Sequence, residues 1–358
     1  MILKYLLIAL GAISLVGCAG ETEQVNQVPT LSGEAPIIIA HRGASGERPE
    51  HTLAAYTLAI EQGADFIEPD LVLTKDGVLV ARHENEISET TDVADKSEFA
   101  DRKTTKTIDG REFTGWFTED FTLAELKTLR AKERLPELRE ANMEYDGQFA
   151  IPTFEEVLQL VQAHEDKSGK RIGVYPETKH PSYFVSISLP HQQPLLELLA
   201  KYGFDGSDDP VFIQSFEVGN LKALNDVTQV RLVQLMAEEY GPFDIDDLSY
   251  ADMATAQGLI DVAKYADGVG PSKNMVISRN AAGQLDKPTG FVEAAHAAGL
   301  VVHPWTFRRE NYFLPTDCKS GIDPRDPGDL EVEIQAFIAV GVDGLFSDNP
   351  AQAAGLAE

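Results

Sequence analysis

Short runs of apolar residues alternate with stretches of helical length along most of the chain. The run 36–40 contains no polar residue, which is typical of a parallel strand buried on both faces. Thr52 then offers an N-cap for the stretch after it, and Gly63 offers its end. Similar apolar runs recur at 66–74, 171–179, 211–216, 230–236, 266–272, 300–307 and 343–350. This alternation predicts a (β/α)8 TIM barrel over residues 36–355, with a doubly wound open sheet as the alternative.

One strand-like segment breaks the alternation. Only Lys75–Gly77 separates Val78–His83 from the second strand, which is too short for a parallel crossover and fits a hairpin turn. In that hairpin Asp70 lies opposite Arg82. We therefore expect His83 to return beside the carboxylates of the second strand.

Residues 85–150 are polar and irregular, and they are too numerous for a plain loop. Thr122 and Thr153 each begin a capping-box pattern, so we expect one helix at 123–132 and a second that returns to the barrel. We predict that 85–150 forms a small cap over the mouth of the barrel. A mobile surface insertion is the alternative.

Composition narrows the possible partners. The chain has 358 residues, and 43% of them are apolar, which permits a large core. Its net charge of −28 argues against nucleic acid as a partner and against charge-driven docking on anionic lipid. The two cysteines, Cys18 and Cys318, exclude a disulfide-stapled scaffold, and we expect no role for the thiol of Cys318.

The N-terminus has the features of a targeting signal. Residues 1–17 place Lys4 before an apolar run that has the length of a signal-peptide core. The run ends in Leu15-Val16-Gly17-Cys18, which resembles a bacterial lipoprotein signal with Cys18 as the lipidated residue; an ordinary signal peptide is the alternative. Residues 18–35 are polar, and we expect them to form a tether. We expect a lipid-anchored protein on the periplasmic face of the cell envelope, with the outer membrane favoured if there are two. Membrane contact is expected through the anchor only.

Acidic residues stand on two of the predicted strands. Glu68 and Asp70 share one face of the second strand, and Glu177 shares a face with Lys179 on a later strand. Three carboxylates that converge at one barrel mouth would repel each other without a cation. Oxygen ligands of this kind suit Ca²⁺ or Mg²⁺.

Two histidines and two basic residues are expected beside these carboxylates. His41 ends the first strand, and the hairpin brings His83 to the same place. A lone histidine is usually a packing residue, but two that approach the same carboxylates indicate an acid–base pair. Arg42 follows His41 directly, and Arg42 and Lys179 are suited to hold a phosphate.

Six blocks of sequence resemble the glycerophosphodiester phosphodiesterase family, most closely its periplasmic, cap-containing branch. The likeness extends over nearly all of residues 36–355, and the blocks occur in the family's order at 41–52, 63–84, 176–179, 214–216, 303–308 and 347–350. Two positions depart from the usual family pattern: His51 stands in place of Asn, and Glu84 stands in place of Asp.

The resemblance implies metal-dependent hydrolysis of glycerophosphodiesters to sn-glycerol 3-phosphate and an alcohol, with Ca²⁺ as the first candidate and Mg²⁺ as the alternative. It implies that the cation is held by Glu68, Asp70 and Glu177, with Glu50 as a fourth candidate. The implied acid and base are His41 and His83, and the implied phosphate ligands are Arg42 and Lys179. Trp305 and Phe307 would form a wall of the substrate pocket, with ordinary packing in the barrel as the alternative. Attack by water and attack by the glycerol 2-hydroxyl both remain open. Other functions to weigh are a phospholipase of C or D type and a catalytically idle surface-binding lipoprotein.

Overall fold

The computed structural model describes residues 29–356, and most of its strands form one closed parallel barrel. The barrel strands are β1 (Ile37–His41), β2 (Phe66–Glu68) with β3 (Asp70–Leu73), β7 (Gly173–Val174) with β8 (Glu177–Thr178), β9 (Phe212–Ser215), β10 (Arg231–Met236), β11 (Gly268–Pro271), β14 (Val301–Val302) and β15 (Gly344–Ser347). Neighbours run parallel in chain order, and β15 pairs with β1. The N–H of Phe346 donates to the Pro304 carbonyl at 3.1 Å and joins the last two strands. The predicted TIM barrel is confirmed.

Two of the barrel strands are interrupted where the sequence has proline. Pro69 separates β2 from β3, and Pro176 lies between β7 and β8. Proline has no N–H to donate to a neighbouring strand, so the ladder breaks at these positions. The continuous apolar pattern did not reveal either break.

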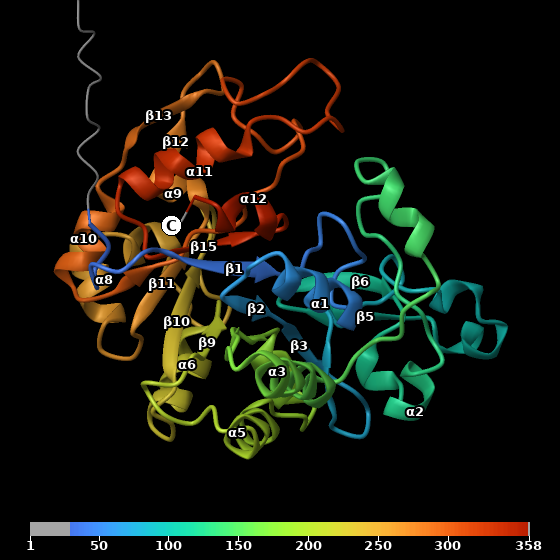
Figure 1. The fold of residues 1–358 in the computed structure, drawn as a ribbon. Coiled ribbons are helices and arrows are strands. Elements are labelled where there is room, and N and C mark those ends of the chain that lie inside the picture. Colours follow the sequence, from blue (N-terminus) through green and yellow to red (C-terminus); the bar gives the residue numbers. More distant parts are fainter. Residues whose placement is uncertain (1–28, 357–358) are drawn as a thin grey trace, which may run out of the picture.

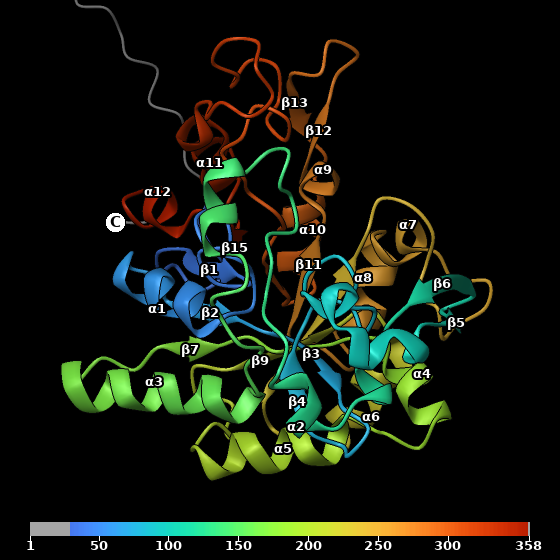
Figure 2. The ribbon, with the colours of Figure 1, turned by 90° about the vertical axis from the view of Figure 1, so that its right-hand side faces the viewer.

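Helices cover the outside of the barrel (Figure 1). They are α1 (Leu53–Glu61), α3 (Phe154–Ser168), α4 (Pro181–Ser186), α5 (Gln192–Lys201), α6 (Val218–Asn225), α7 (Tyr250–Met253), α8 (Ala256–Val262), α9 (Lys273–Val276), α10 (Phe291–Ala297), α11 (Leu330–Ala339) and α12 (Pro350–Ala354). Thr52 caps α1 as predicted, because its hydroxyl accepts from the N–H of Ala55. The Thr153 capping box at the start of α3 is also present. Figure 2 shows α3 and α5 side by side on one flank.

Apolar side chains pack on both surfaces of the barrel. One cluster fills the interior with residues from six strands or strand ends: Ile39, Phe66, Tyr175, Phe212, Val233 and Phe346. Neighbours in sequence point the other way, so Ile38 and Ala40 belong to the larger cluster between strands and helices. The filled interior makes the barrel a rigid support for residues at its rim.

The predicted hairpin is confirmed. β4 (Leu79–Ala81) runs antiparallel to β3, and the N–H of Arg82 donates to the Asp70 carbonyl at 2.9 Å. Gly77 has a φ of 77°, which glycine adopts without strain at this turn.

The insertion 85–150 is folded against the barrel. It contains a hairpin of β5 (Thr104–Ile108) and β6 (Arg111–Gly115) and the short helix α2 (Leu123–Leu126). Its apolar residues Ile87, Val93, Phe99, Trp116, Phe121, Leu126 and Leu129 join the main core. The expected helix at 123–132 is therefore too long: Ala131 instead forms a β-bridge with Thr91. A third hairpin, β12 (Ile277–Arg279) with β13 (Leu285–Pro288), lies outside the insertion and was not expected.

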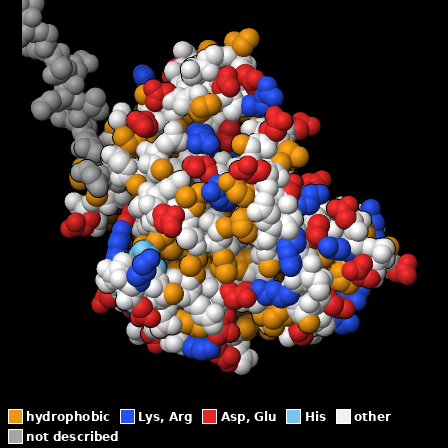
Figure 3. Space-filling view, turned by 45° about the vertical axis from the view of Figure 1, so that its right-hand side comes forward, with side chains coloured by type: hydrophobic (Ala, Val, Ile, Leu, Met, Phe, Trp, Pro, Cys, Tyr) orange, Lys and Arg blue, Asp and Glu red, His pale blue; other side chains and the backbone are white. Residues whose placement is uncertain are grey.

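The expected signal peptide, Cys18 and most of the tether lie outside the described residues. Within residues 29–356, none of the helices combines the length and the apolar character that a membrane span requires. On the face drawn in Figure 3, acidic and basic side chains are intermingled rather than gathered by sign.

Candidate active site

Three carboxylates meet near the carboxyl end of β1. Glu68 ends β2 and pairs with His41, whereas Asp70 begins β3 and pairs with Glu177 of β8. One oxygen of each acidic residue lies within 4.8 Å of an oxygen of the others. All three side chains are buried. The structure thus brings together Glu68, Asp70 and Glu177, the acidic residues that the sequence singled out as a group.

Burial and repulsion disfavour three negative charges in this cluster. Burial, followed by the charge of Asp70, holds the pKa of Glu68 well above its usual range. Burial also raises the pKa of Glu177 to about 8, although Lys179 opposes the shift. Burial acts on Asp70 in the same sense, but Lys179 and a hydrogen bond from His51 hold its pKa well below the usual range.

The cluster fits a divalent cation. Oδ1 of Asp70 is buried and has no hydrogen-bond partner among the described residues. Such an oxygen costs free energy unless something of opposite charge binds it. Carboxylate oxygens at this density are the ligands that Ca²⁺ and Mg²⁺ prefer, because both cations are hard.

Arg42 and Lys179 place positive charge beside the carboxylates. The backbone N–H of Arg42 donates to Oε2 of Glu68 at 2.7 Å, and its Nε lies 3.2 Å from Oδ2 of Asp70. The Nζ of Lys179 lies 2.8 Å from Oε1 of Glu177. Both basic side chains also line the adjoining cavity, where they can bind an anion.

His41 ends β1, and its ring is held by Asp348, which follows β15. The ring Nδ1 lies 2.6 Å from Oδ1 of Asp348. Burial and the charge of Arg42 lower the pKa of His41 to about 4, although Asp348 opposes this. The carboxylate favours a hydrogen on Nδ1, so Nε2 is the nitrogen left to accept a proton. Asp348 was not among the residues predicted for the site, although its place directly after the last strand could have indicated it.

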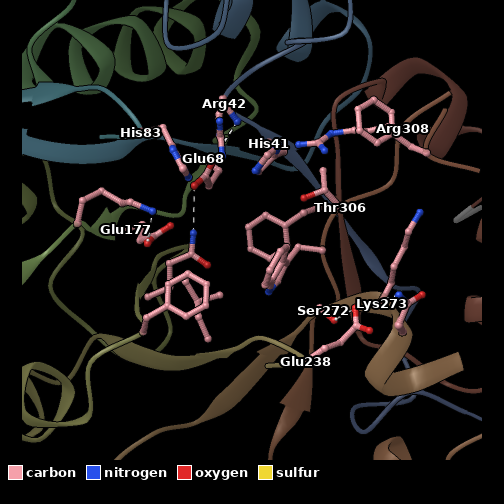
Figure 4. A pocket seen from close by; sticks show the side chains of 18 of the residues that line it. His41, Arg42, Glu68, His83, Glu177, Glu238, Ser272, Lys273, Thr306 and Arg308 are labelled. Carbon is pink, nitrogen blue, oxygen red and sulfur yellow. Dashed lines mark hydrogen bonds and ion pairs between the residues drawn. The ribbon is translucent and has the colours of Figure 1, made fainter. Parts of the chain in front are cut away.

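His83 reaches the same cavity from the end of the β3–β4 hairpin. Its Nδ1 lies 2.5 Å from Oε2 of Glu84. Burial, with the charges of Arg42 and Lys179, lowers the pKa of His83 to about 3. Both histidines therefore have one nitrogen bound to a carboxylate and are neutral at pH 7. Figure 4 shows His41, at the end of β1, and His83, which follows β4, beside Glu68.

The cavity has a volume of about 420 Å³. One end is lined by the two histidines, the two basic side chains, Glu68, Glu177 and Arg308, and the other end by Glu238, Ser272 and Lys273 (Figure 4). Trp305 lines it as expected, with its Nε1 donating to the Gly270 carbonyl at 2.8 Å.

Phe307 does not line this cavity, so its expected place in the substrate wall is wrong. Its backbone N–H donates to Phe346 of β15 at 2.8 Å. The side chain is fully buried in the outer core, where its ring packs edge-on against Phe337 of α11. Its position is that of a packing residue.

Glu50 lies outside the carboxylate cluster, so the structure does not support it as a fourth ligand. Oε2 of Glu50 accepts from Nη1 of Arg42 at 2.9 Å and from Nε of Arg134 at 2.8 Å. Oε1 accepts from Nη2 of Arg134 at 2.7 Å. Burial raises the pKa of Glu50, but Arg134 and Arg42 together hold it well below its usual range. Both oxygens are thus committed to guanidinium groups.

Two further side chains, those of His51 and Gln214, hold carboxylates of the cluster in place. The sequence did not predict which residue either of them contacts. His51 is fully buried, with Nε2 at 2.9 Å from Oδ2 of Asp70 and Nδ1 at 2.8 Å from the hydroxyl of Tyr56. Nε2 of Gln214, on β9, donates to Oε1 of Glu68 at 3.1 Å. The imidazole, from the loop before α1, fixes the rotamer of Asp70, and the amide, from a neighbouring strand, fixes that of Glu68.

Comparison with known sequences points to one family. The model of the "Glycerophosphoryl diester phosphodiesterase family" matches residues 41–352. A glycerophosphodiester phosphodiesterase of Arabidopsis thaliana is 36% identical over 369 aligned residues, which cover 97% of this chain and 95% of that protein. A glycerophosphodiester phosphodiesterase of Haemophilus influenzae is 33% identical and covers 87% of this chain and 89% of its own.

Solved structures agree in fold. A phosphodiesterase of Oleispira antarctica, solved with its product sn-glycerol 3-phosphate, has a TM-score of 0.59 at 21% identity and covers 91% of this chain and 98% of its own. A glycerophosphodiester phosphodiesterase of Agrobacterium tumefaciens has a TM-score of 0.54 at 19% identity, with 89% and 99% covered.

Proposed function

The chain belongs to the glycerophosphoryl diester phosphodiesterase family and is a glycerophosphodiester phosphodiesterase; we propose that it works with a divalent cation and two acid–base histidines. The products we propose are sn-glycerol 3-phosphate and the alcohol of the headgroup. The observation that carries this proposal is one cavity, lined by two carboxylate-bound histidines and two basic side chains, that adjoins a cluster of three buried carboxylates.

Glu68, Asp70 and Glu177 are the residues that would hold the cation. Ca²⁺ is the first candidate because it accepts several carboxylates in irregular geometry, and Mg²⁺ is the alternative. When bound, the cation would stabilise the negative charge that develops on the phosphoryl oxygens. Arg42 and Lys179 would bind the same phosphoryl group from the protein side.

His41 and His83 would divide the proton transfers between them. One neutral imidazole takes the proton of the attacking hydroxyl, whose oxygen forms a bond to phosphorus while the bond to the leaving alcohol breaks. The other, protonated beside the anionic substrate, gives its proton to that alcohol. The attacking hydroxyl belongs either to water or to C2 of the glycerol; the second route gives a cyclic phosphate that water then opens.

Hydrolysis of glycerophosphocholine tests this function. We expect release of choline with sn-glycerol 3-phosphate, loss of activity with a chelator, and recovery with Ca²⁺ or Mg²⁺. A ³¹P spectrum during turnover separates the two routes, because only one passes through a cyclic phosphate. Unchanged activity after exhaustive chelation would refute the cation's role.

We also propose that lipid on Cys18 anchors the enzyme to the bacterial cell envelope, on the periplasmic face. The supporting feature is the sequence Leu15-Val16-Gly17-Cys18 at the end of an apolar run.

We further propose that the insertion 85–150 acts as the cap of the barrel. Its β5–β6 hairpin lines a second cavity that shares Glu177 and Lys179 with the first.

A further inference from the structure

Two arginines of the insertion reach the carboxylates that hold the histidines. Arg134 donates to both oxygens of Glu50, from Nε at 2.8 Å and from Nη2 at 2.7 Å. Its Nη2 also donates to Oε1 of Glu84 at 2.6 Å. The other oxygen of Glu84 is the one bound to Nδ1 of His83. Arg134 and His83 therefore hold Glu84 from opposite sides.

Arg139 makes the corresponding contacts at the other histidine. Its Nη2 donates to Oδ2 of Asp348 at 2.6 Å, while Oδ1 of Asp348 is bound to Nδ1 of His41. Its Nε donates to Glu310 at 2.6 Å, and its Nη1 donates to the Ser45 carbonyl at 2.9 Å. The guanidinium is buried and its three nitrogens are all bonded to protein acceptors.

We propose that Arg134 and Arg139 are positioning residues for catalysis: the insertion holds the two carboxylates that orient the two histidines. This inference rests on the two-histidine mechanism proposed above. Each histidine begins a chain of contacts from imidazole to carboxylate to arginine. At Asp348 the arginine contact is shared, because Oδ2 also accepts from Nε of Arg308 at 2.8 Å. The barrel supplies the first two members of each chain, and the insertion supplies the third.

The geometry favours this role over simple charge balance. A carboxylate bound only to an imidazole can turn about its own torsion, and the imidazole then turns with it. A guanidinium presents donors in a fixed plane, so it restrains the second oxygen and with it the imidazole's direction. The direction of Nε2 toward the substrate matters, because proton transfer requires the donor and acceptor at hydrogen-bond distance.

The test compares Arg134→Ala and Arg139→Ala with Arg102→Ala in the full protein with saturating Ca²⁺. Arg102 is a matched control: it belongs to the same insertion and pairs with Glu125 at 2.5 Å, but contacts neither histidine's carboxylate. Turnover of glycerophosphocholine is divided by the folded fraction, measured by near-UV circular dichroism. We expect kcat to fall about 10- to 100-fold in the two test variants, the usual scale for a group that orients a functional side chain. KM should stay near that of the unchanged protein, and Arg102→Ala should keep its kcat.

Two further variants keep the test decisive if an alanine variant folds poorly. Arg134→Lys and Arg139→Lys retain the charge without the planar fork, so we expect partial recovery of kcat. In a Glu84→Gln background, Arg134→Ala should cost less than in the unchanged protein, because Arg134 acts through Glu84.

The proposal is overturned if the two test variants match Arg102→Ala in kcat per folded molecule, or if the losses from Glu84→Gln and Arg134→Ala simply multiply. Failure of the two-histidine mechanism itself would give a different result. In that case His41→Ala and His83→Ala, with no other change to the enzyme, would retain turnover.

Discussion

Cation binding should release protons and should weaken as the pH falls below about 8. In the cation-free cluster, burial raises the pKa of Glu177 to about 8 and holds that of Glu68 well above its usual range. Glu177 is therefore largely protonated at pH 7, and the shift of Glu68 favours its protonated form in the same direction. A cation binds the charged carboxylates, so each protonated group must first lose its proton.

The magnitude follows from Glu177 alone. With a pKa of about 8, roughly one molecule in eleven has this carboxylate charged at pH 7, so the apparent affinity for Ca²⁺ is about tenfold weaker than well above pH 8. A tenfold change corresponds to about 1.4 kcal/mol. Glu68 adds to the effect in the same direction. The pKa of Glu177 in the folded protein is raised, so the cation-free cluster favours the protonated carboxyl group. The affinity for Ca²⁺ therefore rises with pH.

Isothermal titration with Ca²⁺ between pH 6 and 9, in buffers of different ionisation enthalpy, gives both the affinity and the number of protons released. Glu177→Gln is the matched variant: it should bind more weakly and show a shallower dependence on pH. An affinity that is constant across this range, with no proton release, would contradict the assignment of the cation to this cluster.

Three more outcomes are expected. His41→Ala should lower turnover per folded molecule by about 10²- to 10⁴-fold, the scale for loss of one acid or base, and a pH–rate profile together with the melting temperature should show that the loss is chemical rather than structural. Arg42→Ala should weaken both turnover and the binding of sn-glycerol 3-phosphate, because it removes the guanidinium beside Asp70 that we propose binds the phosphoryl group. An unchanged affinity for sn-glycerol 3-phosphate, measured by titration, would contradict a role of Arg42 in phosphate binding. Cys18→Ser should move the protein from the detergent to the aqueous phase without loss of catalysis, and equal partitioning of both forms would exclude the lipid anchor.

The barrel was readable from the sequence because its strands are buried on both faces. A segment such as 36–40 must be apolar throughout, and the repeat of such segments leaves few architectures. The hairpin was readable for a related reason: Lys75–Gly77 is too short for any parallel connection. The strand positions then placed three carboxylates together, because residues in register on neighbouring parallel strands lie side by side: Glu68, Asp70 and Glu177.

Contacts between distant segments could not be read in this way. Arg134 and Arg139 lie in an irregular stretch whose path depends on tertiary packing, so local sequence does not reveal their partners. Glu50 lies within the block 41–52, yet the approach of Arg134 from the insertion decides which charge its carboxylate meets. Phe307 follows Trp305 with the spacing of one strand face, but its pairing with β15 turns it to the outer core.

Turnover and cation affinity measured together in His83→Ala test the central claim most directly. The account predicts that glycerophosphocholine turnover per folded molecule falls by about 10²- to 10⁴-fold. It predicts that affinity for Ca²⁺ changes little, since the carboxylate cluster is formed by other residues. Turnover close to that of the unchanged enzyme, at equal folded fraction and equal cation affinity, would contradict the two-histidine mechanism.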